Sequence, residues 1–417
     1  MSDPPVRASD ARGILALART DRNAARRALA ELDVDGQVAL VCEAPVAARG
    51  ELLELAPQPE RLIPALPEGE LAFTAKALGL ADAPWVLAHA TPEQVVACVD
   101  LDAWAGNAHA PDPERLGAWI SALAEAGEEP FLRGVQALDA ELLVLWLRER
   151  AEVWLKSDEG FEPPPGARTL DGQFYFSARG SGDDLAEIEK LLDALFREDY
   201  WSYFRLLQGV MWELESDAQE WALRWRTGRL QDLGFPTWEE AMATYGVLSP
   251  RARDELPPAP SAGPDVDWRL PIWMPRLPLS ASAQHSLFRA LAALGEDERR
   301  PQLLAVLALA NRVAVADQLP LGDAETVPLA LDKAVRLASR GLDHLAARHG
   351  LDPAGVLRRA GVEHLFRVGH SLERAEAAPA NEERPASGEP AGLSEEERID
   401  QPTTPAKPAS RRLSGSE

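Results

Sequence analysis

LDVDGQV, the stretch from Leu32 to Val38, indicates the fold because it ends one helix and begins the next. Three later stretches resemble it: LPEGEL (Leu66 to Leu71), ATPEQVV (Ala90 to Val96) and LDAELL (Leu138 to Leu143). In three of the four stretches one side chain can accept hydrogen bonds from the first helical turn, namely Asp33, Thr91 or Asp139. The stretches therefore predict a row of short helices joined by capping turns.

A row of this kind also predicts stacking, because helices of about ten residues are only marginally stable alone. Apolar residues recur three and four apart from Ser9 to Ser157, which is the helical period. The row is stable only where neighbouring helices bury each other's apolar faces. We therefore predict an all-α fold in which short stacked, solenoid-like helices (1–157) precede further helical domains. The uneven spacing between the four stretches does not indicate a regular array.

One interruption separates this repeat region from the helices that follow. Residues 163–165 are three consecutive prolines, and TLDGQFYF (169–176) joins the turn pair Asp171-Gly172 to β-prone aromatic residues. We therefore predict at most one small β-hairpin here. The predicted organisation beyond 157 is a β-hairpin plus Trp-rich helical domain (158–249), a Pro-rich strap (250–279), a C-terminal helical domain (280–376) and a disordered tail (377–417). Trp268 and Trp273 are too apolar for a free linker and predict that a domain holds the strap.

The charge balance bears on the class of partner. The 417 residues include 43 Lys and Arg against 67 Asp and Glu, a formal net charge of −24. A surface of that sign repels phosphates, so we predict no nucleic-acid partner. We also expect no signal peptide and no membrane insertion, because the first residues lack an apolar stretch and the longest apolar run, 303–310, is too short. Cys42 and Cys98 form no disulfide framework, which favours a reducing, cytoplasmic location.

Motifs for catalysis, cofactors and metals are missing from the sequence. It contains no HExxH, paired cysteines, EF-hand loop, GxSxG or phosphate-binding glycine loop. His344 and His349, five residues apart, lie about 140° from each other on a helix and cannot bind one metal from one face. We therefore predict no catalytic residue, no cofactor and no metal site.

The densest feature is EWALRWRTGRLQDLGFPTW, residues 220–238. Helical angles of about 100° per residue place one set of residues on a single face; these are Ala218, Trp221, Ala222, Trp225, Arg229 and Asp232. The face could be an aromatic wall ending in an arginine, suited to an anionic or ring-bearing ligand or to a partner's helix. It could equally be a domain core in which Asp232 or another acid holds Arg229, and tryptophans at helical spacing favour this second interpretation. Two capping boxes are predicted nearby, Ser216 with Gln219 and Thr237 with Glu240.

A second candidate region lies in the C-terminal helices. Residues 303–316 are apolar on every side of the predicted helix, which indicates that the helix is buried. Its polar residues Asn311 and Arg312, with the following Asp317, need partners there. They either satisfy the turns of neighbouring helices or line a polar pocket between helices.

Two resemblances rest on these stretches. WRTGRLQDLGFPTWEEA (225–241), LDGQFYF (170–176), ANRVAVAD (310–317) and LFRVGHSL (365–372) together resemble an uncharacterised bacterial family, the domain of unknown function numbered 6178. This resemblance covers the chain except its tail and implies no activity, ligand or catalytic residue. The four N-terminal stretches are also similar to the cytoplasmic helical superhelix at the N-terminus of MgtE-type magnesium transporters. Because the transporter's membrane helices are missing from the sequence, transport is not implied.

The sequence therefore favours a non-catalytic cytoplasmic scaffold or adaptor that binds a protein partner, since stacked helices usually present a concave surface. One alternative is an acidic regulatory module that senses divalent cations through clustered carboxylates. A second is an enzyme with a pocket at the Arg229 and Asp232 end of the tryptophan face. The sequence identifies neither the partner nor the oligomeric state.

Overall fold

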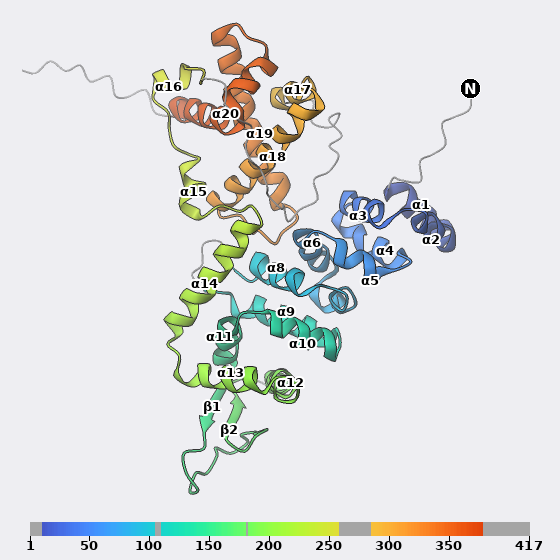
Figure 1. The fold of residues 1–417 in the computed structure, drawn as a ribbon, viewed down its shortest axis with the longest axis vertical. Helices are drawn as coiled ribbons and strands as arrows, with labels where there is room; N and C mark the ends of the chain where they lie inside the picture. Colours follow the sequence, from blue (N-terminus) through green and yellow to red (C-terminus); the bar gives the residue numbers. More distant parts are fainter. Residues whose placement is uncertain (1–10, 105–109, 181, 258–284, 378–417) are drawn as a thin grey trace, which may run out of the picture. The chain divides into compact units, whose positions relative to one another are not determined.

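The computed structural model describes residues 11–104, 110–180, 182–257 and 285–377 (Figure 1). Within these ranges lie twenty α-helices, two short 3-10 helices and one two-stranded sheet. The predicted all-α class with one small β element is therefore confirmed. Among the described helices, none combines the length and the apolar character needed to cross a membrane.

Short helices form the first region of the chain, as the capping stretches predict. They are α1 (Ala11–Thr20), α2 (Arg22–Ala30), α3 (Val34–Glu43), α4 (Val46–Leu55), α5 (Pro59–Leu62), α6 (Glu68–Leu78), α7 (Pro84–Leu87), α8 (Pro92–Asp102), α9 (Pro113–Glu125), α10 (Glu128–Ala137) and α11 (Ala140–Arg150). The 3-10 helices are η1 (Ile63–Ala65) and η2 (Leu80–Asp82). Packing is between near neighbours, since α6 lies against α4 and α8, and α8 lies against α10. That these helices form a true repeat stays a prediction.

Two of the three predicted caps form. The Asp33 carboxylate accepts from the Gly36 N–H at 2.8 Å, and Thr91 forms a complete capping box with Gln94. Asp139 precedes α11 as predicted but makes no side-chain cap. The cap prediction for Asp139 is wrong because its carboxylate pairs with Arg229, far away in sequence.

The sheet joins β1 (Ala151–Leu155) to β2 (Phe174–Ala178) in antiparallel register, with Ala151 opposite Ala178 and Leu155 opposite Phe174. The strand at the β-prone aromatic residues is confirmed, but the expected helix over 151–155 is wrong. Helix α11 ends at Arg150, and the next five residues are extended. Asp171 and Gly172 do form a turn, in which Asp171 accepts from the Gln173 N–H at 2.8 Å and Gly172 has a φ of 70°.

The remaining helices vary more in length. They are α12 (Gly182–Glu198), α13 (Tyr200–Trp212), α14 (Glu215–Asp232), α15 (Trp238–Ala243), α16 (Pro250–Asp254), α17 (Ser286–Ala292), α18 (Glu296–Ala316), α19 (Thr326–His349) and α20 (Pro353–Ala377), the last kinked at Gly361. The capping box of Thr237 and Glu240 at α15 is confirmed. The box predicted for Ser216 and Gln219 is wrong, because α14 begins one residue before Ser216 and Gln219 donates to Glu215.

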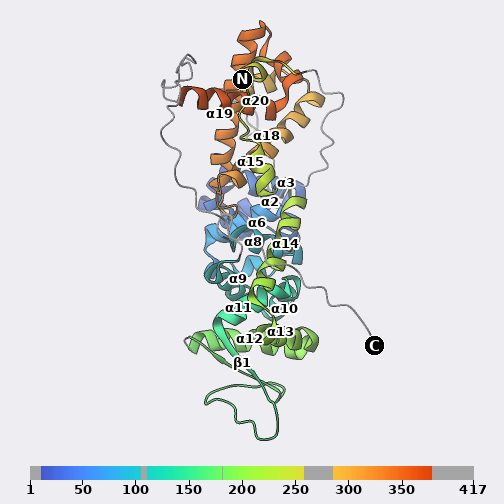
Figure 2. The same cartoon turned by 90° about the vertical axis from the view of Figure 1, so that its left-hand side faces the viewer.

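Two large apolar clusters form the core. The first contains buried residues from Ala11 to Phe235, and the second contains residues from Leu287 to Val368. Helix α14 lies against α8 and α11 of the first cluster (Figure 2). Phe73 of α6 contacts Leu307 of α18, and Lys76 pairs with both Asp102 and Asp323. These contacts link α6 to α18 and to the loop that follows it.

Some predictions cannot be compared with the structure. Most of the Pro-rich strap, including Trp268 and Trp273, lies outside the described residues, and so does the predicted disordered tail except for Ala377. Described residues 250–254 of the strap are helical, as α16. The predicted domain boundaries stay predictions.

Candidate functional site

Helix α14 carries the tryptophans on its exposed side. Trp221 and Trp225 are 44% and 47% exposed, and their rings stack with centroids 5.7 Å apart. The guanidinium of Arg224 lies 5.1 Å from the centre of the Trp221 ring. The buried line of α14 runs instead through Ala218, Ala222, Arg226 and Leu230. The tryptophans therefore lie on the surface, whereas Ala218 and Ala222 of the same predicted face are buried in the core.

Arg229 is held by two acids from other helices. It donates from Nε and Nη2 to the two carboxylate oxygens of Asp100, at 2.6 and 3.0 Å. It also donates from Nη1 and Nη2 to Asp139, at 2.9 and 2.6 Å. Asp100, at the buried side of α8, has a side chain only 1% exposed. Burial raises the pKa of Asp100, and its hydrogen bonds to Arg229 act in the opposite direction.

Asp232 does not share in this arrangement, because its side chain is exposed on the last turn of α14. It borders an open cavity of about 460 Å³ together with Asp100 and Arg229. Arg229 is therefore held by Asp100 and Asp139 and not by Asp232. The domain-core alternative allowed for an acid other than Asp232, and both acids lie far from Arg229 in the sequence.

Arg226, one turn before Arg229, is the most deeply buried cation of α14. The Arg226 residue is 8% exposed. Its Nε donates to the backbone oxygen of Asp100 at 2.8 Å, and its guanidinium lies 4.9 Å from the centre of the Trp104 ring. Within the described part of the chain, its Nη1 and Nη2 donate no hydrogen bond and form no ion pair. Burial lowers the pKa of Arg226 to about 10, so the group keeps its charge at neutral pH.

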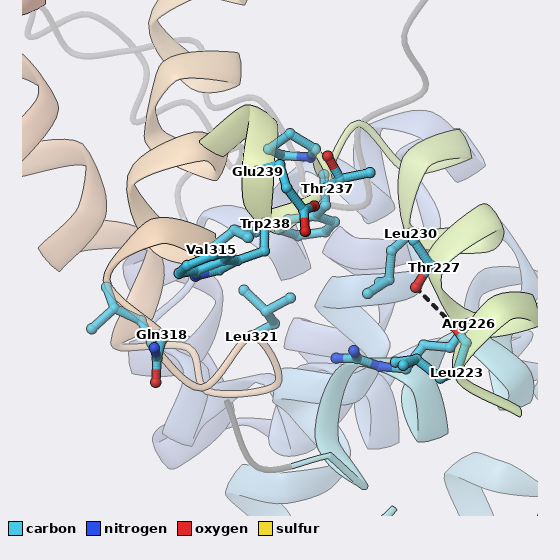
Figure 3. A pocket seen from close by; sticks show the side chains of 13 residues that line it. Leu223, Arg226, Thr227, Leu230, Thr237, Trp238, Glu239, Val315, Gln318 and Leu321 are labelled. Carbon is cyan, nitrogen blue, oxygen red and sulfur yellow. Dashed lines mark hydrogen bonds between the residues drawn. The ribbon is translucent and has the colours of Figure 1, made fainter. Parts of the chain in front are cut away.

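Arg226 borders a cavity of about 490 Å³ between α14, α15 and the C-terminal end of α18 (Figure 3). Apolar side chains make up most of the lining: Leu223, Leu230, Phe235, Pro236, Trp238, Val315, Leu319 and Leu321. Figure 3 shows Arg226 reaching from α14 into this space, below Leu230 and toward Leu321. Gln318 lies on the opposite wall and has a φ of 56°, the only positive φ of a non-glycine residue in the described ranges.

Comparison with known proteins places the chain in one family. Residues 26–382 match the model of a family of unknown function, DUF6178. The chain belongs to this family. No curated protein and no solved structure matches it. The similarity of the N-terminal stretches to MgtE-type transporters is not supported by these comparisons and stays a prediction.

The matched range of this DUF6178 protein includes the second candidate region, whose three residues have separate partners. Asn311 Nδ2 donates to the Gly234 carbonyl at 3.2 Å, and Arg312 lies 3.7 Å from the Glu363 carboxylate. Asp317 accepts from the Tyr245 hydroxyl at 2.9 Å and from Lys333 at 2.6 Å. The three residues therefore connect neighbouring elements and do not converge on one pocket.

Sequence reasoning missed Arg226 and Gln318. Arg226 follows Ala218 and Ala222 at intervals of four and precedes Leu230 by four, so a charged residue interrupts the small and apolar line that faces the core. That interruption was a usable signal for a buried cation. The sequence around Gln318 contains no such signal, because the left-handed backbone of Gln318 depends on how the chain leaves α18. In the described ranges of this DUF6178 protein, no group of three or more His, Cys, Asp or Glu residues could hold a metal ion.

Proposed function

We propose that the protein is a non-catalytic helical scaffold that binds a partner protein through an aromatic stripe on α14. The stripe consists of Trp221, Arg224, Trp225 and Gly228, spaced so that all four lie along one side of the helix. The observation that carries the proposal is the exposure of the stacked tryptophan pair. Tryptophan and arginine dominate the binding energy of protein interfaces, and exposed apolar patches mark interaction sites.

Further exposed apolar side chains precede the stripe in sequence. Trp201 and Trp212 of α13, and Leu214 in the turn before α14, are all exposed. Soluble proteins usually bury such side chains, because an exposed indole forgoes the gain from leaving water. Their number on two consecutive helices supports a binding surface around α13 and α14.

Gly228 shapes the stripe. No atom lies within 4 Å of the position that a β-carbon at Gly228 would occupy, so the helix backbone is open to solvent there. A partner's side chain can therefore approach the α14 backbone beside Trp225. Small residues allow such close approach between helices, which supports a helix as the bound element.

The charges around the stripe indicate the chemistry of that helix. Exposed Asp217 and Glu220 lie at the N-terminal end of the stripe, and exposed Asp232 lies at its C-terminal end. The net charge of −24 opposes the approach of a second copy of this chain. The partner that fits is an amphipathic helix with an apolar centre and basic residues at both ends.

Site-specific photo-crosslinking tests the proposal. Gln231→p-benzoylphenylalanine in the full chain places the crosslinker at an exposed position one turn beyond Gly228 and leaves the four stripe residues unchanged. In lysate of the native host we expect a crosslink to a different protein, through a peptide that forms a basic amphipathic helix. Trp221→Ala with Trp225→Ala should abolish the crosslink, whereas Leu329→Ala, a control at an exposed apolar residue of α19, should preserve it. A crosslink to a second copy, no crosslink, or a yield insensitive to Trp221 and Trp225 contradicts the proposal.

A further inference from the structure

We infer that the cavity between α14, α15 and the end of α18 binds a small monocarboxylate with an apolar body, whose carboxylate pairs with Arg226. This site is separate from the aromatic stripe, because the stripe residues do not line the cavity. A comparison with Arg229 on the same helix shows why Arg226 is available.

Arg229 has all three guanidinium nitrogens occupied by Asp100 and Asp139. Arg226 is fixed in place by one backbone hydrogen bond and by the Trp104 ring, which leaves both terminal nitrogens without a described partner. Buried cations are normally paired, because removing an ion from water costs several kcal/mol. The two free nitrogens of a guanidinium form a planar fork that matches the two oxygens of a carboxylate. An anion that enters the cavity can therefore pair with both terminal nitrogens.

The walls define the rest of the ligand. Eight of the thirteen lining residues are apolar, including Leu230, Trp238 and Leu321. Cavities of about 300 to 1,000 Å³ with apolar walls and few polar groups are typical sites for small molecules, and this one measures about 490 Å³. A ligand that fills it needs an apolar body to match these walls.

The charges favour a single negative charge on that ligand. Arg226 is the one cation among the lining residues, and the carboxylate of Glu239 also borders the cavity. The Asp100 carboxylate already stabilises the charge of Arg226. A phosphate dianion would be repelled by Glu239, by Asp100 and by the net charge of −24. A carboxylate monoanion satisfies the arginine with the least repulsion.

Binding of octanoate to the full-length protein tests the inference, with 1-octanol as the uncharged probe and octyl phosphate as the dianionic one. Calorimetric titration at low salt should show octanoate binding at least about tenfold more tightly than 1-octanol, as a charge-assisted pair with arginine predicts. Octyl phosphate should bind more weakly than octanoate. Arg226→Met should remove the preference for octanoate over 1-octanol, and Arg224→Met, which removes an exposed cation of the same helix, should retain it.

Two further measurements test the inference if the Arg226→Met variant does not fold. Val315→Phe narrows the cavity from the α18 side and leaves Arg226 unchanged. This substitution should weaken the binding of both octanoate and 1-octanol. In the unaltered protein, octanoate should protect Arg226 but not Arg224 from phenylglyoxal, as read by peptide mass spectrometry. The inference is overturned if octanoate does not bind, binds no better than 1-octanol, binds more weakly than octyl phosphate, or leaves Arg226 unprotected. None of these outcomes depends on the Gln231 crosslink.

Discussion

Replacing Arg229 by methionine should destabilise the folded state by about 3–5 kcal/mol, the usual cost of removing one partner of a buried ion pair. The substitution removes four hydrogen bonds and leaves two carboxylates close together. Asp100 dominates the cost, because its carboxylate is only 1% exposed and cannot be rehydrated. Asp139 is 15% exposed and adds less, since water can partly replace the lost arginine.

Urea unfolding followed by circular dichroism measures this cost as a shift in the midpoint. Asp100→Asn combined with Arg229→Met should recover part of the loss, because the buried carboxylate that Arg229 held is then absent. Without Arg229, the pKa of Asp100 is raised further by its burial, so the folded state takes up a proton more readily than the unfolded chain. The loss of stability in Arg229→Met should therefore shrink as the pH falls through that raised pKa.

Arg205→Met, which removes an exposed cation 3.6 Å from Glu141, serves as control and should lower the free energy of unfolding by less than about 1 kcal/mol. A loss in Arg229→Met as small as in this control, or no recovery in the double variant, refutes the reasoning.

Three other predictions concern packing, thiols and cations. Gly228→Ala should raise the free energy of unfolding by about 0.5–1 kcal/mol, because its β-carbon meets no atom within 4 Å. Gly341→Ala should lower the free energy of unfolding by about 1–3 kcal/mol, because its β-carbon would meet the Leu365 carbonyl oxygen. Urea titrations in which both substitutions change the stability in the same direction would contradict these predictions. Burial, followed by neighbouring carboxylates, raises the pKa of Cys42 and Cys98, so both thiols should resist iodoacetamide at pH 8 in the folded protein and react in urea. Millimolar Mg²⁺ should leave the melting temperature unchanged, and an increase of several degrees would favour the cation-sensing alternative.

Local chemistry predicted much of the fold, and long-range contacts account for the errors. Asp33 and Thr91 cap their helices because a cap needs only the adjacent turn. Asp139 has the same local pattern, yet Arg229, ninety residues away, takes its carboxylate. No local feature of the sequence distinguishes these cases.

The tryptophan face shows the same limit in another form. The helical period correctly places Trp221 and Trp225 together, but it does not say which side of the helix meets the core. The buried line through Ala218, Ala222 and Leu230 is centred about a quarter of a turn away from the tryptophans. Small residues on the buried line let α14 lie close to α8 and α11, so the bulky indoles remain outside.

Asp100 connects the structural ion pair to the inferred ligand site. Both of its carboxylate oxygens are engaged by Arg229, so Arg226 receives only its backbone oxygen. The occupied carboxylate is therefore the reason that the terminal nitrogens of Arg226 remain free. In Arg229→Met that carboxylate loses its partner, and the cation left to stabilise its charge is Arg226. Octanoate should then bind less tightly to Arg229→Met than to the unaltered protein, although Arg229 does not line the cavity. Asp100→Asn should restore octanoate binding in the same background, because an amide competes poorly for the guanidinium. Unchanged octanoate binding in Arg229→Met would show that Arg226 is free for some reason other than the engagement of Asp100.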